Sequence, residues 1–227
     1  MTANVYQYFD VLQFPELELN KDFVTNHQDS ILHEVDETPH SIIRYLGYSD
    51  LPSCKKYHVI HEVFKKTQGR LKNETISGYI EQINFHIFIN ENRLLINSTN
   101  NISKELLKRI RKTNDDFRIE ASKIDLISFS EDLRNNIRGG WFGNLKVADV
   151  TSIGMFGPTV GESDEWERYN KKGDLKAINV QFYGQNETIL FQITKNRGIV
   201  HYDKRNESEI LRKLLEVQKI LDGYITK

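Results

Sequence analysis

The sequence has few of the features that cross-link, secrete or anchor a protein. Its 227 residues include a single cysteine, Cys54, so no disulfide forms within the chain. The longest apolar runs, such as residues 87–89, are far shorter than the ~20 residues that span a bilayer. The first ten residues have neither the basic nor the apolar segment of a secretory signal. These absences predict a cytoplasmic protein without a membrane partner.

Local signatures of common catalytic sites are also missing. The chain contains no GxxxxGK phosphate loop, no GxGxxG, no GxSxG nucleophile elbow and no HExxH zinc site. The triplet Glu-x-Lys, which many nucleases place on a strand, does not occur either. Cys54 stands at the start of an expected helix, where a thiol pKa falls, but a lone cysteine is weak evidence for a nucleophile. We therefore expect no cofactor, no metal and no marked catalytic residue.

Alanine is scarce, with four occurrences, whereas Asn, Ile and Lys are used heavily. These three residues have AT-rich codons. The composition favours a bacterial, phage or other mobile-element source, or a defence context.

Charge is nearly balanced overall but unevenly distributed. The net charge is −1, yet residues 1–50 contain nine acidic side chains against Lys21 and Arg44, which makes that segment about −7. By subtraction, the rest of the chain is about +6. The pattern fits either an acidic and a basic face with different partners or a chance distribution.

The first 72 residues are predicted to form a mainly helical N-terminal segment. Thr38-Pro39 is typical of a helix start, with Thr as N-cap and Pro at the first helical position, and Gly47 ends that helix. Ser53 is a second N-cap candidate, and Gly69 is the expected end of its helix. The apolar face of this second helix consists of residues at helical spacing: Tyr57, Ile60, His61 and Phe64.

Residues 73–227 are expected to form one α+β domain. Apolar and polar side chains alternate over residues 83–89, which predicts a strand, and residues 93–96 return as its antiparallel partner. A helix follows, with its apolar face over residues 102–110.

The second half is expected to be an antiparallel β-meander with packed amphipathic helices. Residues 126–137 fit a helix stopped by the glycines at 139 and 140, and residues 166–169 fit a short strand. The meander spans residues 145–202, and an amphipathic helix over about residues 207–221 closes it.

The hairpin–helix layout of residues 83–112 recurs in residues 189–221. Either a weak internal duplication or the convergence of two ordinary units explains this similarity of layout.

Two groups of basic residues are candidates for binding nucleic acid. Along a helix, side chains at i, i+4, i+7 and i+8 line one side and can follow a phosphate backbone. A solvated helix face that keeps the protein soluble is the alternative explanation. The first group is Lys55, Lys56, Lys65, Lys66, Arg70 and Lys72, and the second is Lys104, Lys108, Arg111 and Lys112.

Trp141 and Phe142 stand between glycines in the stretch Gly-Gly-Trp-Phe-Gly, followed by Gly-Met-Phe-Gly at residues 154–157. An exposed aromatic pair with flexible flanks would anchor a protein partner or form a platform for a base. The alternative is that both rings tuck under the edge of the sheet.

We interpret the chain as a non-catalytic binding module that acts on nucleic acid or within a multi-protein complex. The alternative is an enzyme, similar to a hydrolase or nuclease, with a site assembled from residues distant in sequence. Its candidates are His58, His61 and the acidic residues of the loop at 162–165.

Overall fold

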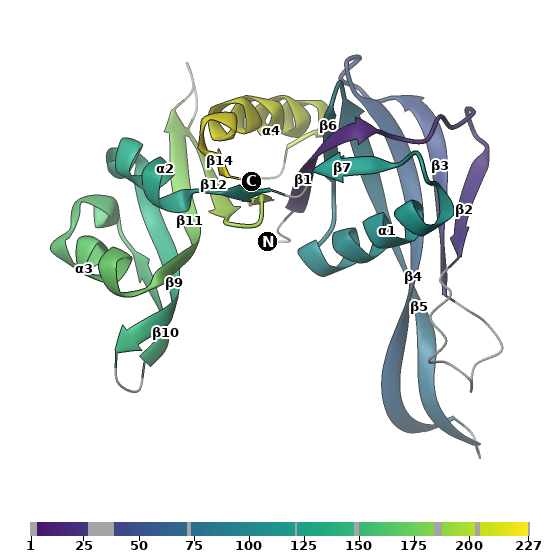
Figure 1. Cartoon of the computed structure of the whole chain (residues 1–227), viewed down its shortest axis with the longest axis horizontal. Helices are drawn as coiled ribbons and strands as arrows, with labels where there is room; N and C mark the ends of the chain where they lie inside the picture. Colours follow the sequence, from purple (N-terminus) through teal and green to yellow (C-terminus); the bar gives the residue numbers. More distant parts are fainter. Residues whose placement is uncertain are drawn as a thin grey trace. The chain divides into compact units, whose positions relative to one another are not determined.

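The structure is a computed structural model (Figure 1) that describes residues 4–26, 39–71, 74–120, 122–147, 150–183, 188–202 and 205–226. The chain divides into two compact units: Met1–Phe9 with Ala121–Lys227, which we call the terminal unit, and Asp10–Glu120, which we call the inserted unit. The expected boundary at residues 72 and 73 falls on residues outside the described ranges.

The inserted unit consists of an antiparallel sheet and one helix. Neighbouring strands follow the order β6-β5-β4-β3-β2, and the last residues of β1 pair with β7. The elements are β1 (Asn4–Gln13), which begins in the terminal unit, β2 (Asp22–Asn26), β3 (His40–Tyr48), β4 (Lys55–Leu71), β5 (Glu74–Asn90), β6 (Arg93–Ile96), α1 (Asn100–Thr113) and β7 (Arg118–Glu120).

The terminal unit contains the other helices and a second set of antiparallel strands in the order β10-β9-β11-β12-β13-β1. A short pair, β8 with β14, lies outside this path. The elements are β8 (Lys123–Ile124), α2 (Leu126–Asp132), β9 (Ile137–Val147), β10 (Val150–Phe156), α3 (Asp164–Lys172), β11 (Asp174–Tyr183), β12 (Thr188–Thr194), β13 (Gly198–His201), α4 (Glu207–Leu221) and β14 (Ile225–Thr226), with 3-10 turns at Arg134–Asn136, Val160–Glu162 and Asp222–Tyr224.

The predicted helical N-terminal segment is wrong, and the fold is mostly β. The two expected helices are the strands β3 and β4, and Thr38 lies outside the described residues. In β4 the buried side chains Tyr57, Val59 and His61 alternate as in a strand, and Glu62 is buried on the opposite face. A polar residue at an inward position hid this alternation, because the histidine interrupts the apolar pattern of that face. Ile60 faces the other side of the strand, but together with Tyr57 and His61 it produces the spacing of an apolar helix face by chance.

Two predictions in the terminal unit are also wrong. The helix expected over residues 126–137 ends at Asp132, and Ile137 already begins β9, which contains the two glycines expected to stop the helix. The strand expected at residues 166–169 is part of the helix α3. Two features favour a helix here: the Ser163 hydroxyl accepts a hydrogen bond from the Trp166 amide at 3.2 Å, and acidic residues in the first turn interact favourably with the helix dipole.

The predictions for the strongly periodic segments are confirmed. The hairpin–helix layout is present as β5, β6 and α1, and again as β12, β13 and α4. The closing helix α4 has the predicted bounds, with Asn206 as its N-cap. The stretch expected as one strand from residue 145 to residue 156 is instead divided between the end of β9 and β10, which pair with each other.

The β4–β5 hairpin is much longer than its neighbours. Among the described residues, β3 pairs with β4 only as far as His61. Beyond that point, residues 62–71 of β4 and 74–82 of β5 pair with each other, and we call this two-stranded part the β4–β5 arm. Figure 1 shows the arm extending past α1. A two-stranded ribbon is only marginally stable by itself.

Glycines in β9 and β10 make room for aromatic rings. Trp141 is directly opposite Gly154, and Phe156 is opposite Gly139, so each ring lies over the glycine of the facing strand. On the other face of β9, the ring of Trp166 lies over Gly140. A side chain at any of these glycines would occupy the space of a ring.

The substitution Gly140→Ala is expected to destabilise the protein by about 1–3 kcal/mol, the usual cost of overpacking. Its Cβ would lie 2.5 Å from Cη2 of the buried Trp166, so the indole would have to move. Urea unfolding measures the change. The control is Gly157→Ala, whose Cβ would have its nearest neighbour at 3.9 Å and which should leave the stability nearly unchanged. Equal effects of the two substitutions would contradict this account of the glycines.

Candidate nucleic-acid interface

Helix α1 has one face turned to the sheet of the inserted unit and one face exposed. Leu106, Leu107 and Ile110 are buried on the inner face, as the sequence predicted. The same face carries Arg109, whose side chain is only 1% exposed. A buried guanidinium is costly unless each of its polar groups finds a partner, so its contacts determine how the helix is held.

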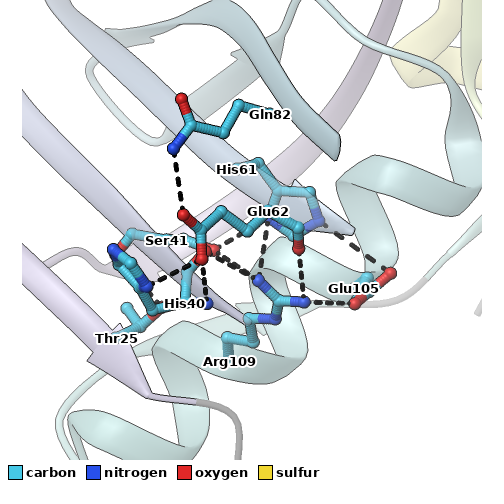
Figure 2. Close-up of polar contacts among 8 residues, drawn as sticks. All are labelled: Thr25, His40, Ser41, His61, Glu62, Gln82, Glu105 and Arg109. Atoms are coloured by element: carbon cyan, nitrogen blue, oxygen red, sulfur yellow. Dashed lines mark hydrogen bonds and ion pairs between the residues drawn. The ribbon is translucent and has the colours of Figure 1, made fainter. Parts of the chain in front are cut away.

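Arg109 is held by backbone and side-chain oxygens from two strands and from its own helix (Figure 2). Its Nη1 donates to the backbone oxygen of His40 and to Oγ of Ser41, both at 3.0 Å. Its Nη2 donates to the backbone oxygen of Glu62 at 2.8 Å and to the carboxylate of Glu105. Because β3 supplies His40 and Ser41 and β4 supplies Glu62, one side chain ties α1 to both strands.

Ser41, His61 and Glu105 lie in sequence-distant elements but form one chain of polar contacts in Figure 2. Ser41 Oγ is 2.8 Å from Nδ1 of His61, and Nε2 of the same ring is 3.9 Å from Oε2 of Glu105. Arg109 Nη1 lies 3.5 Å from Nδ1 and can only donate. Nδ1 is therefore the acceptor, and in the neutral ring the proton sits on Nε2, facing the carboxylate.

The residue types match those of a catalytic triad, but the geometry and burial do not. Ser41 and His61 are completely buried, so no substrate reaches the hydroxyl. A separation of 3.9 Å between Nε2 and the carboxylate oxygen is also longer than a hydrogen bond. We interpret the group as a structural network that positions α1.

On the opposite face of β4, Glu62 extends the network. Its Oε2 is 2.8 Å from Nδ1 of His40 and accepts from the His40 amide at 3.1 Å. Its Oε1 accepts from Nε2 of Gln82, on β5, at 3.0 Å. Thr25 of β2 donates to the backbone oxygen of Ser41. The strands β2 to β5 are thus linked where α1 is attached.

The consequence for the surface is that the exposed charged residues of α1 are all basic. Glu105 is the only acidic residue in the helix, and it is engaged by Arg109 and His61 at the sheet. The basic residues of the outer face are all exposed: Lys104, Lys108, Arg111 and Lys112. The four residues of the predicted stripe therefore lie on the exposed face of α1.

The other basic group does not form a helix stripe. Because β4 is a strand, consecutive side chains point to opposite faces: Lys55 and Lys65 share one face, and Lys56 and Lys66 the other. Lys56 Nζ lies 5.8 Å from the centre of the Phe88 ring, and Lys65 Nζ is 3.3 Å from a Glu81 oxygen. Lys65 and Lys66 belong to the β4–β5 arm.

Two members of that group cannot be placed further. Arg70 lies in β4, but its side chain is outside the described part of the structure, and Lys72 is outside the described residues altogether.

Trp141 and Phe142 are separated by the alternation of β9. Phe142 is 1% exposed, and its ring centre is 5.0 Å from that of Trp166 in the core of the terminal unit. Trp141 is 45% exposed and contacts Phe156, which is 56% exposed. The sequence analysis did not select Phe156 as a site residue, although Phe156 precedes a glycine, as Phe142 does.

The candidates for an enzyme site belong to different faces of a strand or to different units. His58 faces the opposite side of β4 from His61, with its ring 5.6 Å from that of His86. The acidic residues of the loop at 162–165 belong to the terminal unit, whereas both histidines belong to the inserted unit. Cys54 is fully buried, and burial raises the pKa of its thiol, contrary to the expectation of a helix N-terminus there.

Within the described ranges, no group of three or more His, Cys, Asp or Glu side chains is arranged to hold a metal ion. None of the helices in the described part of the chain is both long and apolar enough to cross a bilayer. A comparison with known protein families finds no match, and a comparison with curated proteins finds no relative.

The substitution Arg109→Met is expected to reduce the free energy of unfolding by about 3–5 kcal/mol, because it leaves buried acceptors on β3 and β4 without a donor. Chemical denaturation measures this loss. The matched control is Arg168→Met, which breaks an exposed ion pair with Glu165 on α3 and should cost about 0–1 kcal/mol. Similar losses in both variants would show that Arg109 has no special structural role.

Glu105 is expected to make stability depend on pH in the acid range. Its contact with His61 and the charge of Arg109 lower the pKa of its carboxyl from 4.5 to about 2 in the folded state. The ionised carboxylate therefore stabilises the fold above pH 4.5, and this contribution is lost as pH falls towards about 2.

Because the carboxylate is about a third exposed, solvent screening reduces the contribution to about 1–2 kcal/mol. The difference in unfolding free energy between the wild type and Glu105→Gln should have this size near neutral pH. It should shrink steadily below pH 4.5. A difference that stays constant across this pH range would contradict the assignment.

Proposed function

We propose that the inserted unit binds nucleic acid through the exposed basic face of α1. The observation that carries the proposal is the uneven distribution of charge on this helix. Four basic residues are exposed, while the only acidic residue is neutralised at the sheet by Arg109. A basic face with no interspersed acid attracts a phosphate backbone, whereas a merely solvating face usually mixes both signs.

The spacing of the basic residues supports the same function. Lys104, Lys108 and Arg111 follow one another along about two turns of helix, a rise of ~10 Å at 1.5 Å per residue. Their side chains can therefore meet successive phosphates. Arg111 and Lys112 stand in the last turn of α1, where positive charges interact favourably with the helix dipole. This interaction explains basic residues at positions 111 and 112 but not at positions 104 and 108, which lie further from the end of the helix.

The β4–β5 arm is a second element suited to a long, charged partner. It is a two-stranded ribbon with the exposed residues Lys65, Lys66 and Tyr79. A ribbon of this kind fits into a nucleic-acid groove, and such binding would stabilise a hairpin that has little support of its own.

An enzyme site gains less support than a binding surface. The residues of the inserted unit whose types match a catalytic triad, Ser41 and His61, are buried and in contact with one another. The exposed basic residues of α1 and of the β4–β5 arm are suited to recognition.

A second candidate function is the binding of a protein partner by the terminal unit. It is favoured by the exposed ring pair Trp141 and Phe156, whose centres are 5.4 Å apart on the β9–β10 hairpin. Strand β10 stands at the end of its strand order, and exposed aromatics are common anchors of protein interfaces.

The double variant Arg111→Gln/Lys112→Gln tests the nucleic-acid proposal. Fluorescence anisotropy with a labelled oligonucleotide, measured at several salt concentrations, should show weaker binding. The slope of log K against log salt should fall by about 1.4–1.8, the value for two lost phosphate contacts.

The matched control is Lys171→Gln/Lys172→Gln, which removes the basic pair in the last turn of α3 and so has the same effect on a helix dipole. It should leave affinity and slope unchanged. Equal losses in both variants would indicate general attraction to a positive surface. Binding that does not depend on salt concentration would refute the proposal, and so would the absence of binding at low salt.

A further inference from the structure

The inserted unit contains a cavity that the function proposed for α1 does not use. Its volume is about 370 Å³, within the usual range for small-molecule sites. It lies between the chain that follows β1 and the ends of β3, β4 and β5. Its lining is Val11, Leu12, Gln13, Phe14, Pro15, Glu16, Leu17, Tyr45, Lys55, Tyr57, Ile89, Glu91 and Asn92.

Three aromatic rings contribute to the wall, those of Phe14, Tyr45 and Tyr57. The ring of Tyr57 is 5.2 Å from that of Phe14 and 5.0 Å from that of Tyr45. Tyr57 is nearly buried, and burial raises its pKa to about 12, so its hydroxyl stays neutral at physiological pH. The rings offer flat apolar surfaces suited to stacking a planar group.

Charged residues complete the lining. Lys55 supplies one cation, and Glu16 and Glu91 supply two carboxylates, all three exposed to solvent. Carboxylates accept hydrogen bonds from amino groups, as acidic side chains do from the exocyclic amine of cytosine. The cavity thus combines stacking surfaces with acceptors for an amine and one cation for an anionic group.

The cavity is also close to α1 along the chain. The ring of Phe14 contacts Phe117 at 5.8 Å, and Phe117 is four positions after Thr113, the last residue of α1. A fully extended chain of that length covers at most roughly 14 Å. The last turn of α1, with Arg111 and Lys112, is therefore close enough to the cavity wall for a segment of a few nucleotides to contact both.

We propose that the cavity takes one unstacked base of a single-stranded nucleic acid, with a preference for bases that carry an amino group. The inference rests on the proposed function of α1, whose basic face would hold the neighbouring phosphates. The base would stack on Tyr45, Glu16 and Glu91 would accept from its amino group, and Lys55 would face the backbone. This mode adds base recognition to phosphate contacts that carry no sequence information.

The test compares oligo-dC with oligo-dT, about twelve nucleotides long, by fluorescence anisotropy with the full chain. Both have the same backbone and both are pyrimidines, but only cytosine has the amino group. The wild type should bind oligo-dC about fivefold more tightly or better. Glu16→Met/Glu91→Met, at two exposed positions, should remove this preference while leaving the salt dependence of oligo-dT binding intact.

Tyr45→Leu should weaken the binding of both oligonucleotides by about fivefold or more, the usual effect of a lost stacking partner. The matched control is Tyr48→Leu, the same change on the same strand at a residue that does not line the cavity. Circular dichroism of the variants verifies their folding.

The outcomes separate the two proposals. Equal binding of oligo-dC and oligo-dT, together with equal effects of Tyr45→Leu and Tyr48→Leu, would overturn the cavity proposal and leave α1 as a phosphate-binding surface. Binding of dCMP as tight as that of oligo-dC would overturn it in favour of a free-nucleotide site. Failure of either oligonucleotide to bind at low salt would refute both proposals.

Discussion

The structure of the inserted unit depends on one buried charge, the guanidinium of Arg109. In a buried position it requires hydrogen bonds from several directions, and it finds them on β3, on β4 and on its own helix. Rotation of α1 about its axis would break these bonds. The same interaction that attaches the helix therefore determines which of its side chains face solvent, and it engages Glu105 on the inner side.

Alternation along strands has the corresponding effect elsewhere. Neighbours in sequence are sent to opposite faces, so Lys55 lines the cavity while Lys56 lies over Phe88. Likewise Phe142 enters the core and Trp141 stays exposed. Surface features in this protein are built from residues of different strands, as the ring pair of Trp141 and Phe156 illustrates.

Sequence reasoning succeeded where a single periodicity was strong and was unsuccessful where two signals competed. The helices α1 and α4, the strands β6 and β11 to β13, and the second half of β5 have regular apolar patterns and were predicted correctly. In β4, the inward position of His61 broke the pattern. In β9, glycines that accommodate rings from the facing strand and from α3 resembled the end of a helix.

The sequence by itself determined the two hairpin–helix units, the basic stripe of α1 and the lack of local catalytic motifs. These properties are local, because the spacing of the apolar residues within a segment indicates which of its sides is buried. Only the tertiary structure decided that β3 and β4 are strands, that Arg109 is buried, and that Phe14, Tyr45 and Tyr57 meet around one cavity. These features depend on contacts between residues far apart in the chain, and no local pattern encodes such a partner.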